Sequence, residues 1–369
     1  MADRILKLRD LNRATLARQM LLKREPLPAI AAVERLVGLQ AQLPIAPYVG
    51  LWTRLHDFSR EDLARAIKDR KIVKATLMRA TLHLCSTNDY LQFRTTLQPM
   101  LSGAGDAIVK QRGGKFDSKK LLAEARRYIG EKPRTFAEIS DWVVKLMPGH
   151  DVGALRYTVR TNIPLVQTPI ATGWSYSTKP EFTLAERWIG RPIASEDNLP
   201  ELVRRYLRAF GPASVTDAQT WLGMKLKETF EKLRPELQTY RDEGRRELFD
   251  LPDLSLPDAD LPAPVRFLPE FDNLLLSHSN RTRVVTDEFR SKVFLPALRV
   301  AATVLVDGFV CAAWKVEKSK DAATLMIEPF AKLAKPDRAG LLEEGERLVR
   351  FIEENAKSYD VQIMKPAFG

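Results

Sequence analysis

Apolar residues recur at helical spacing through the middle of the chain, and this pattern predicts three helices followed by two strands. The helical stretches cover residues 118–130, 135–147 and 152–163, and their apolar positions fall three or four residues apart on one face. Residues 165–177 contain short apolar runs around a Gly-containing turn, which predicts a β-hairpin. Three helices followed by a hairpin form a winged-helix unit, a helix-turn-helix with an added β wing.

Related patterns before and after this segment indicate a repeated unit. Each copy has a helix-start signature, in which a hydroxyl residue is followed three positions later by an acid or an amide. The signatures begin at Ser59, Thr135 and Thr216, about 80 residues apart. In the first copy we expect a hairpin behind a set of helices at 10–23, 28–39, 47–56 and 60–70. In the third copy we expect a wing near 240–251 behind helices at 200–211, 216–224 and 226–237.

The pattern changes after a proline-rich stretch. Residues 251–264 contain four prolines, which cannot donate to a β-ladder, so we expect a linker there. Beyond it, Asp307-Gly308 stands between two apolar runs and predicts a type I′ hairpin. Residues 337–356 have the pattern of an amphipathic helix, and residues 360–363 of a closing strand. This end of the chain is therefore expected to form a small barrel or sandwich with one helix.

Together these elements place the chain in the α+β class, as three tandem winged-helix units followed by a small C-terminal β-barrel-like domain. A length of 369 residues is sufficient for two or three independent cores. The expected boundaries are 1–98, 99–195 and 196–250 for the three units, 251–264 for the linker and 265–369 for the C-terminal domain.

The charge distribution favours a polyanionic partner. The chain carries 58 Lys and Arg against 47 Asp and Glu, a net charge of +11. Residues 1–100 hold 17 basic and 9 acidic side chains, so most of the excess lies there. A localised basic excess is typical of a protein that binds nucleic acid. The alternative is a surface charge that only keeps the protein in solution.

Few residues are suited to disulfide or metal chemistry. Cys85 and Cys311 are the only cysteines, which excludes a disulfide framework and indicates a reducing compartment. The four histidines lack the spacing of a metal-binding motif, so we expect neither a metal nor another cofactor. No apolar run approaches the roughly 18 residues of a membrane span, and residues 1–16 lack the apolar core of a signal peptide. We expect a cytoplasmic monomer without a membrane partner.

Two glutamines, Gln40 and Gln42, stand where a predicted helix ends before a proline. Gly38 weakens the end of this helix, and Pro44 disfavours helical geometry at the residue before it. In a helix, residues two apart point about 200° away from each other, whereas in an extended segment they point the same way. The two amides can therefore converge on one ligand. The alternative is that both are solvated at a helix end and have no role.

Five segments spread over nearly the whole chain resemble the winged-helix DNA glycosylases of the AlkZ type. They are LNRATLARQMLL, VGLQAQLPIAPYVGLWTRL, LMRATLHLCSTNDY, GPASVTDAQTWLG and LPEFDNLLLSHSNRTRV. The resemblance implies three winged-helix units, a C-terminal β-barrel, and removal of N7-alkylated guanines or unhooking of interstrand crosslinks. In some members this activity gives self-resistance to a DNA-alkylating natural product. The most specific element is a Gln-apolar-Gln motif, which falls on Gln40, Ala41 and Gln42. The resemblance makes Gln40 and Gln42 the catalytic pair, although a related branch has Asp at the second position.

Neutral amides suit a leaving group that is already activated. Alkylation at N7 places a positive charge on guanine and weakens its glycosidic bond, so a held water is the main requirement. Each glutamine offers an acceptor oxygen and N–H donors, which can hold that water by positioning. Glutamine cannot act as a base near neutral pH, so uncharged bases should be poor substrates. No lysine is implied as a Schiff-base nucleophile. We expect a monofunctional glycosylase acting on double-stranded DNA that carries an alkylated or crosslinked guanine.

Two further groups of polar residues are candidates for DNA contact. Arg79, Thr81 and His83 alternate along the predicted first wing, where they either face DNA beside the glutamines or belong to a half-buried strand. A second cluster is expected to line a DNA channel and comprises His278, Asn280, Arg281 and Arg283. Glu270 and Asp272 have the spacing of paired acids, but this spacing before an apolar run is more typical of a structural turn.

Two other functions are compatible with the predicted fold. A winged-helix transcription regulator would bind one operator sequence and would need no glutamine pair. A lesion-binding protein would sequester damage without cleaving it. All three functions predict a DNA affinity that falls steeply with salt.

Overall fold

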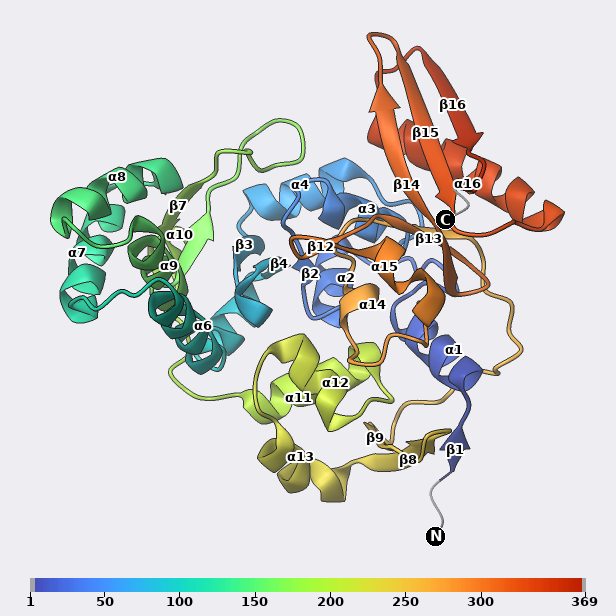
Figure 1. Cartoon of the computed structure of the whole chain (residues 1–369), viewed down its shortest axis with the longest axis horizontal. Coiled ribbons are helices and arrows are strands. Elements are labelled where there is room, and N and C mark those ends of the chain that lie inside the picture. Colours follow the sequence, from blue (N-terminus) through green and yellow to red (C-terminus); the bar gives the residue numbers. More distant parts are fainter. Residues whose placement is uncertain (1–3, 367–369) are drawn as a thin grey trace.

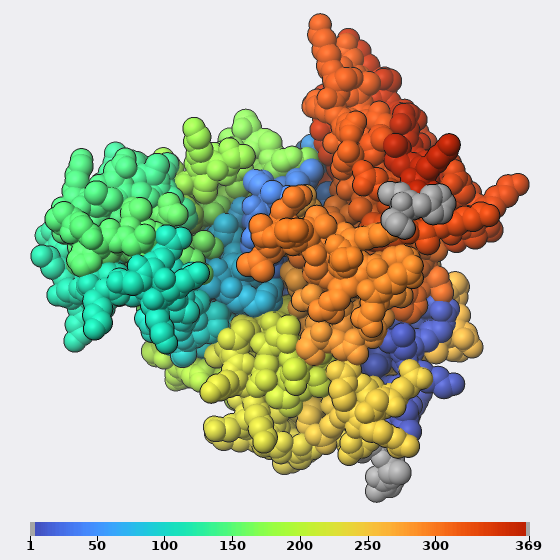
Figure 2. Space-filling model, viewed as in Figure 1, coloured from blue at the N-terminus to red at the C-terminus, as the bar shows by residue number. Residues whose placement is uncertain are grey.

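The computed structural model describes residues 4–366, which form helices and four β-sheets (Figure 1). The lighter blue helices of the N-terminal segment lie at the centre, and the green helices of the second segment form a lobe on one side. The orange and red C-terminal part lies on the other side, and the yellow third segment lies below. In the space-filling view a hollow separates the upper part of the green lobe from the red C-terminal part (Figure 2). This arrangement confirms a mixed α+β architecture.

The N-terminal segment contains the expected helices, each shorter than its pattern suggested. They are α1 (Leu8–Arg18), α2 (Ala29–Arg35), α3 (Ala46–Trp52) and α4 (Arg60–Lys68). Ser59 caps α4 as expected, because its side chain accepts a hydrogen bond from the backbone N–H of Asp62. The predicted hairpin follows as β3 (Ile72–Thr76) and β4 (Leu82–Ser86), joined through the short 3-10 turn η1 (Met78–Ala80). Two more helices lead to the next segment, α5 (Thr87–Phe93) and α6 (Gln98–Gln111).

The second segment forms the predicted three helices, α7 (Ser118–Glu131), α8 (Phe136–Leu146) and α9 (Val152–Asn162). Their apolar stripes meet in a common core, in which Leu121, Ile139 and Leu155 are fully buried. The capping box at the start of α8 is confirmed, because Thr135 and Glu138 each accept a hydrogen bond from the other's backbone N–H.

The hairpin expected at 165–177 is displaced. β6 (Leu165–Gln167) pairs with β7 (Glu181–Leu184), which precedes α10 (Ala185–Ile189). The second strand lies later than predicted because residues 168–180, with two prolines and a glycine, form a loop between β6 and β7.

The strands of the first two segments join in one sheet. Its order is β2-β4-β3-β6-β7-β5, where β2 is Leu39–Gln40 and β5 is Arg134–Thr135. Antiparallel pairing of Ala75 with Val166 connects the two hairpins. The first two segments are therefore coupled through backbone hydrogen bonds.

The third segment contains α11 (Leu199–Phe210), α12 (Val215–Leu222), α13 (Lys227–Leu233) and the short turn η2 (Arg234–Glu236). The hairpin expected there is present as β8 (Gln238–Asp242) and β9 (Glu247–Asp250), to which β1 (Ile5–Leu6) adds in parallel. The predicted start of α12 is wrong by two residues. Ser214, not Thr216, is the N-cap, and the residue that completes the capping box is Asp217.

The C-terminal part is an open sheet with the order β10-β13-β14-β15-β16. Its strands are β10 (Arg266–Leu268), β13 (Thr303–Val306), β14 (Phe309–Lys318), β15 (Ala322–Pro329) and β16 (Ser358–Ile363). The predicted turn between β13 and β14 is confirmed by positive φ angles at Asp307 and Gly308. Helix α16 (Lys335–Ile352) packs against the sheet, with Leu341 and Leu348 fully buried in its core. The expected barrel is not confirmed, because β10 and β16 lie at opposite edges and the sheet does not close.

Short elements connect these parts. Between β10 and β13 lie α14 (Asn273–Leu276), the turn η3 (Asp287–Phe289), α15 (Arg290–Val293) and the small pair β11 (Phe294–Leu295) and β12 (Arg299–Val300). Residues 251–264, where a linker is predicted, contain no helix or strand. Among residues 4–366, no helix is long and apolar enough to cross a membrane.

Candidate active site at the Gln40–Gln42 motif

A sharp reversal of the chain brings the glutamine motif into the central sheet. Helix α2 ends at Arg35, and Val37 and Gly38 then adopt left-handed backbone conformations with φ of 54° and 84°. A side chain at Gly38 would place its Cβ 3.1 Å from the carbonyl oxygen of Leu84, so glycine permits this close approach. The chain leaves the turn as β2 and pairs with β4.

Asn273 holds the free edge of this short strand. Its Nδ2 donates to the carbonyl of Gly38 at 2.6 Å, and its Oδ1 lies 3.4 Å from the backbone N–H of Gln40. Asn273 follows Asp272, the N-cap of α14, which forms two hydrogen bonds with the buried guanidinium of Arg54. Asp272 is therefore structural, as its spacing suggested. The role of Asn273 was not predicted, although the cap-forming Asp-Asn sequence was a local signal for an ordered turn.

The two glutamine side chains converge as the extended geometry predicts. Nε2 of Gln40 donates to Oε1 of Gln42 at 3.2 Å. Gln40 is 6% exposed, whereas Gln42 is open to solvent and Ala41 between them is buried. The pair therefore has one fixed member and one member at the surface.

Arg79 is the third member of this group. Its Nη2 donates to Oε1 of Gln40 at 2.7 Å, and its Nη1 donates to the carbonyl of Trp221 in α12. The prediction that Arg79 shares a strand face with Thr81 and His83 is wrong, because Arg79 lies in the turn η1. Burial, followed by the nearby positive charge of Arg281, lowers the pKa of Arg79 to about 10, so it stays protonated at neutral pH.

His83 lies beside Gln40 in the sheet but is fully buried. Its Nδ1 donates to the carbonyl of Thr81 at 3.1 Å, and its Nε2 has no hydrogen-bond partner among residues 4–366. Burial and the neighbouring charge of Arg79 lower the pKa of His83 to about 3, so the imidazole is neutral. In this structure His83 offers DNA neither surface nor charge, and Thr81 is half-buried.

Lys74 is the buried lysine of the same sheet, and it faces away from Gln40. Lys74 pairs with Leu84, and Leu84 pairs with Leu39, which places these three side chains on the face opposite Gln40 and His83. Burial lowers the pKa of Lys74 to about 8, and its Nζ lies 4.9 Å from the ring centroid of Tyr176. A lysine with such a pKa is suited to Schiff-base chemistry, but the strand geometry keeps it from the glutamines.

Arg281 and Asn280 are the members of the second predicted cluster that remain accessible. Asn280 is exposed, and half-buried Arg281 stacks on the ring of Phe294 at 3.9 Å. The positive charge of Arg281 also acts on Arg79, whose pKa it lowers. Both remain candidates for DNA contact.

His278 and Arg283 lie in the interior. They are 2% and 3% exposed, and both make hydrogen bonds with backbone carbonyls. Burial and the charge of Arg283 lower the pKa of His278 to about 3. In this structure neither side chain presents a surface to DNA.

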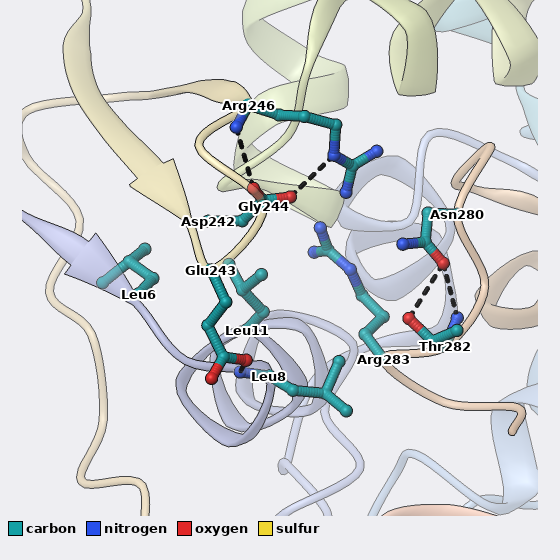
Figure 3. A pocket seen from close by; sticks show the side chains of 10 residues that line it. All are labelled: Leu6, Leu8, Leu11, Asp242, Glu243, Gly244, Arg246, Asn280, Thr282 and Arg283. Atoms are coloured by element: carbon teal, nitrogen blue, oxygen red, sulfur yellow. Dashed lines mark hydrogen bonds and ion pairs between the residues drawn. The ribbon is translucent and has the colours of Figure 1, made fainter.

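A separate pocket of about 260 Å³ includes Arg283 and Asn280 in its lining (Figure 3). Its wall includes Asp242 and Arg246 from the β8–β9 turn, and the carboxylate of Asp242 accepts hydrogen bonds from the backbone N–H and Nε of Arg246. The opposing charges compensate each other, and none of the glutamine-site residues lines this pocket. A wider groove of about 620 Å³ lies beside Arg79, between α6 and the C-terminal end of α12.

The site offers neutral hydrogen-bonding groups under a positive potential. The Gln42 side chain is accessible, and each glutamine oxygen keeps one lone pair beyond the hydrogen bond described. Such an arrangement can hold and orient a water molecule. Because amides do not ionise near neutral pH, it cannot supply a strong base.

A family model, a curated protein and a solved structure each match this chain over most of its length. A family model for DNA glycosylases of the AlkZ-like type matches residues 33–351. A curated relative from Streptomyces sahachiroi, named "Interstrand DNA cross-link repair glycosylase", is 25% identical over 346 residues, covering 85% of this chain and 88% of the relative. The solved structure of Streptomyces sahachiroi DNA glycosylase AlkZ matches with a TM-score of 0.78 and 22% identity, over 98% of this chain and 100% of that chain. At this identity the structural match shows a common fold.

Proposed function

Because the chain belongs to the AlkZ-like DNA glycosylase family, we propose that this monofunctional DNA glycosylase hydrolyses the glycosidic bond of bulky or crosslinking N7-alkylguanine adducts. The observation that carries the proposal is the hydrogen-bonded pair of Gln40 and Gln42, with Gln42 at the surface. The name of the Streptomyces sahachiroi relative, which refers to interstrand crosslinks, supports the choice of substrate. Repair of alkylated DNA or self-resistance to a DNA-alkylating natural product is the proposed role.

The chemistry of the pair suits a charged leaving group. The base takes the electron pair of the glycosidic bond and leaves as a neutral N7-alkylguanine, while positive charge develops at C1′ of the sugar, so the bond breaks without prior protonation. What the protein adds is a water held near C1′ by Gln40 and Gln42, the proposed catalytic residues. The water loses its proton only after bond breaking has progressed, so a strong base is not needed.

An open site also suits a crosslinked base. Guanines tied to both strands cannot rotate freely into a deep pocket, which other glycosylases use. Gln42 is exposed, and Arg79 and Arg281 add positive charge nearby. We propose that double-stranded DNA lies over this surface and contacts Arg281 and Asn280, with one protein molecule acting alone.

We also propose that the three helical segments act as winged-helix units, with β3–β4, β6–β7 and β8–β9 as their wings. Each hairpin follows helices in the order that this motif requires. The first two wings share a sheet, which supports a fixed spacing between these units.

The test is release of base from a duplex that carries one N7-alkylguanine, measured with purified protein and with substrate in excess. The proposal predicts base release above the spontaneous rate and several turnovers per protein molecule. Tight binding that ends at one equivalent without release would instead indicate a lesion-binding protein. A specific footprint on undamaged DNA without abasic-site formation would indicate a transcription regulator.

A further inference from the structure

The guanidinium of Arg79 joins the glutamine pair to the end of helix α12. One nitrogen donates to the side chain of Gln40, and the other donates to the carbonyl of Trp221. Trp221 lies in the last turn of α12, where carbonyls lack intrahelical donors and the helix dipole is negative. Both terminal nitrogens of Arg79 are therefore engaged inside the protein, and the side chain is not extended toward solvent.

This contact determines the orientation of the Gln40 amide. A guanidinium has donors only, so the Gln40 atom facing it is the oxygen. The amide nitrogen then faces Gln42, and because it only donates, the Gln42 atom facing it is also an oxygen. The amide nitrogen of Gln42 is thereby left for another partner. Without Arg79, either amide could turn by half a rotation and present the opposite set of groups.

The backbone holds Arg79 in an unusual conformation. Arg79 and its neighbour Ala80 both have φ of 54°, a left-handed geometry that residues with a Cβ rarely adopt. The end of α12 packs directly behind this turn, since a Cβ on Gly223 would lie 3.4 Å from Cα of Arg79. Such geometry persists only where the surroundings fix it, and it is frequent at functional sites.

From these contacts we propose that Arg79 is a positioning residue for base release, which holds the Gln40 amide so that Gln42 presents its N–H groups to the reacting water. The inference rests on the proposed function of the glutamine pair. It differs from the role expected from the sequence, in which Arg79 contacts DNA. A positioning residue affects the chemical step, whereas a phosphate contact affects DNA affinity and its dependence on salt.

The main experiment separates the chemical step from binding. Single-turnover base release from an N7-alkylguanine duplex is measured at saturating protein, and Kd is measured by fluorescence anisotropy. Arg79→Met keeps an unbranched apolar side chain and removes the hydrogen-bond donors. We expect the rate to fall about tenfold to a hundredfold, with Kd within about twofold of the wild-type value. Arg79→Lys keeps the charge but not the fork of donors, and its rate should lie between the two.

Arg70 provides a matched control. It is exposed, has φ of 57°, and donates to the carbonyl of Trp188, but it lies at the opposite end of β3. Arg70→Met therefore removes an arginine–tryptophan carbonyl contact without touching the glutamines. We expect its base-release rate to equal that of the wild type.

A double-mutant cycle distinguishes positioning from general structural support. If Arg79 acts through Gln40, then Arg79→Met has no further effect on the rate in a Gln40→Ala background. The inference would be overturned if the rate of the double variant were reduced by the product of the two single reductions. It would also be overturned by an Arg79→Met variant with a higher Kd and an unchanged single-turnover rate.

A second readout needs no activity. Glutamine side-chain amide signals in NMR spectra, assigned with Gln40→Ala and Gln42→Ala, report how each amide is held. Arg79→Met or Arg79→Lys should shift the Gln40 and Gln42 signals, whereas Arg70→Met should leave them in place. Unshifted signals would overturn the positioning role even if wild-type protein released the base. Absence of base release by the wild type, with shifted signals, would instead overturn the proposed function alone.

Discussion

Two polar clusters of this molecule differ in how completely their hydrogen-bonding groups are paired. The first joins Arg79, Gln40 and Gln42 and ends at the surface. The second is centred on buried Asp217, whose carboxylate accepts four hydrogen bonds, from the backbone N–H and hydroxyl of both Ser214 and Ser279. The first cluster leaves donors and acceptors unused, whereas at Asp217 the carboxylate is fully engaged. Polar residues indicate a functional site when some of their donors and acceptors are unpaired and a ligand can reach them.

The second cluster connects elements that are far apart in sequence. His278 donates to the carbonyl of Phe210 at the end of α11, and Arg283 donates to Thr15 in α1. Asp217 belongs to the first turn of α12. These contacts bind the C-terminal part to the first and third segments, so their expected role is stability.

The largest effect should follow from shortening Gln42, the solvent-exposed member of the first cluster. Gln42→Ala removes the proposed water-holding group, and we expect single-turnover base release to fall about 100-fold. Because Gln42 is exposed, the free energy of unfolding should change by no more than about 0.5 kcal/mol. Urea titration of the same preparation checks the second value. A variant that unfolds at a lower urea concentration than the wild type but keeps the wild-type rate of base release would contradict the comparison.

Asp217→Ala should give the opposite profile. Removing the buried carboxylate leaves the two serine hydroxyls and backbone donors without a partner, which should cost about 3 kcal/mol of unfolding free energy. Below its melting temperature the folded variant should release base near the wild-type rate. Equal stability of variant and wild type in urea would show that the cluster does not hold these elements together.

A smaller effect is expected from acidification, through the buried histidines. The pKa of His278 is about 3 in the folded protein and near 6.5 when unfolded. Below pH 6.5 the unfolded state takes up a proton that the folded state does not, so stability falls as the pH falls. This one residue should lower the free energy of unfolding by about 2 kcal/mol between pH 7 and pH 5.

His278→Asn isolates that contribution. The variant should lose about 2 kcal/mol less than the wild type over the same pH interval, while His83 contributes equally to both proteins. An identical pH dependence in the two proteins would mean that His278 is already accessible to protons.

The smallest effect is expected from Arg281, which lies beside the first cluster. Arg281 carries a charge near Arg79 without contributing to the hydrogen bonds of the glutamines. Arg281→Met should weaken binding to undamaged and damaged duplex alike by about twofold to tenfold. The slope of the logarithm of affinity against the logarithm of salt concentration should fall in magnitude by about one. An unchanged Kd and salt slope would remove Arg281 from the proposed DNA contacts.

Local patterns predicted the elements of this fold well. The helices that build the core of the second segment, the caps at Ser59 and Thr135, and the turn at Asp307-Gly308 follow from short-range rules and are confirmed. The convergence of Gln40 and Gln42 followed from the period of an extended strand. These features depend on residues within a few positions of one another.

Long-range features were missed for a physical reason. The sheet shared by the first two segments depends on Ala75 meeting Val166, which no local pattern specifies. The burial of His278 and Arg283 depends on α1 and α11 packing over them. Likewise, the pairing of Arg79 with Gln40 depends on a tight left-handed turn between β3 and β4. The residues between these strands include neither the glycine nor the asparagine that usually signals such a turn.

The central claim is that two neutral amides release only a base that already carries positive charge. Its most direct test compares wild-type single-turnover rates on two duplexes, one with an N7-alkylguanine and one with an unmodified guanine in a G·T mismatch. We expect release of the alkylated base well above its spontaneous rate and no detectable release of the mismatched guanine. Comparable acceleration of both would contradict the account, because it would require an acid or base that Gln40 and Gln42 cannot provide.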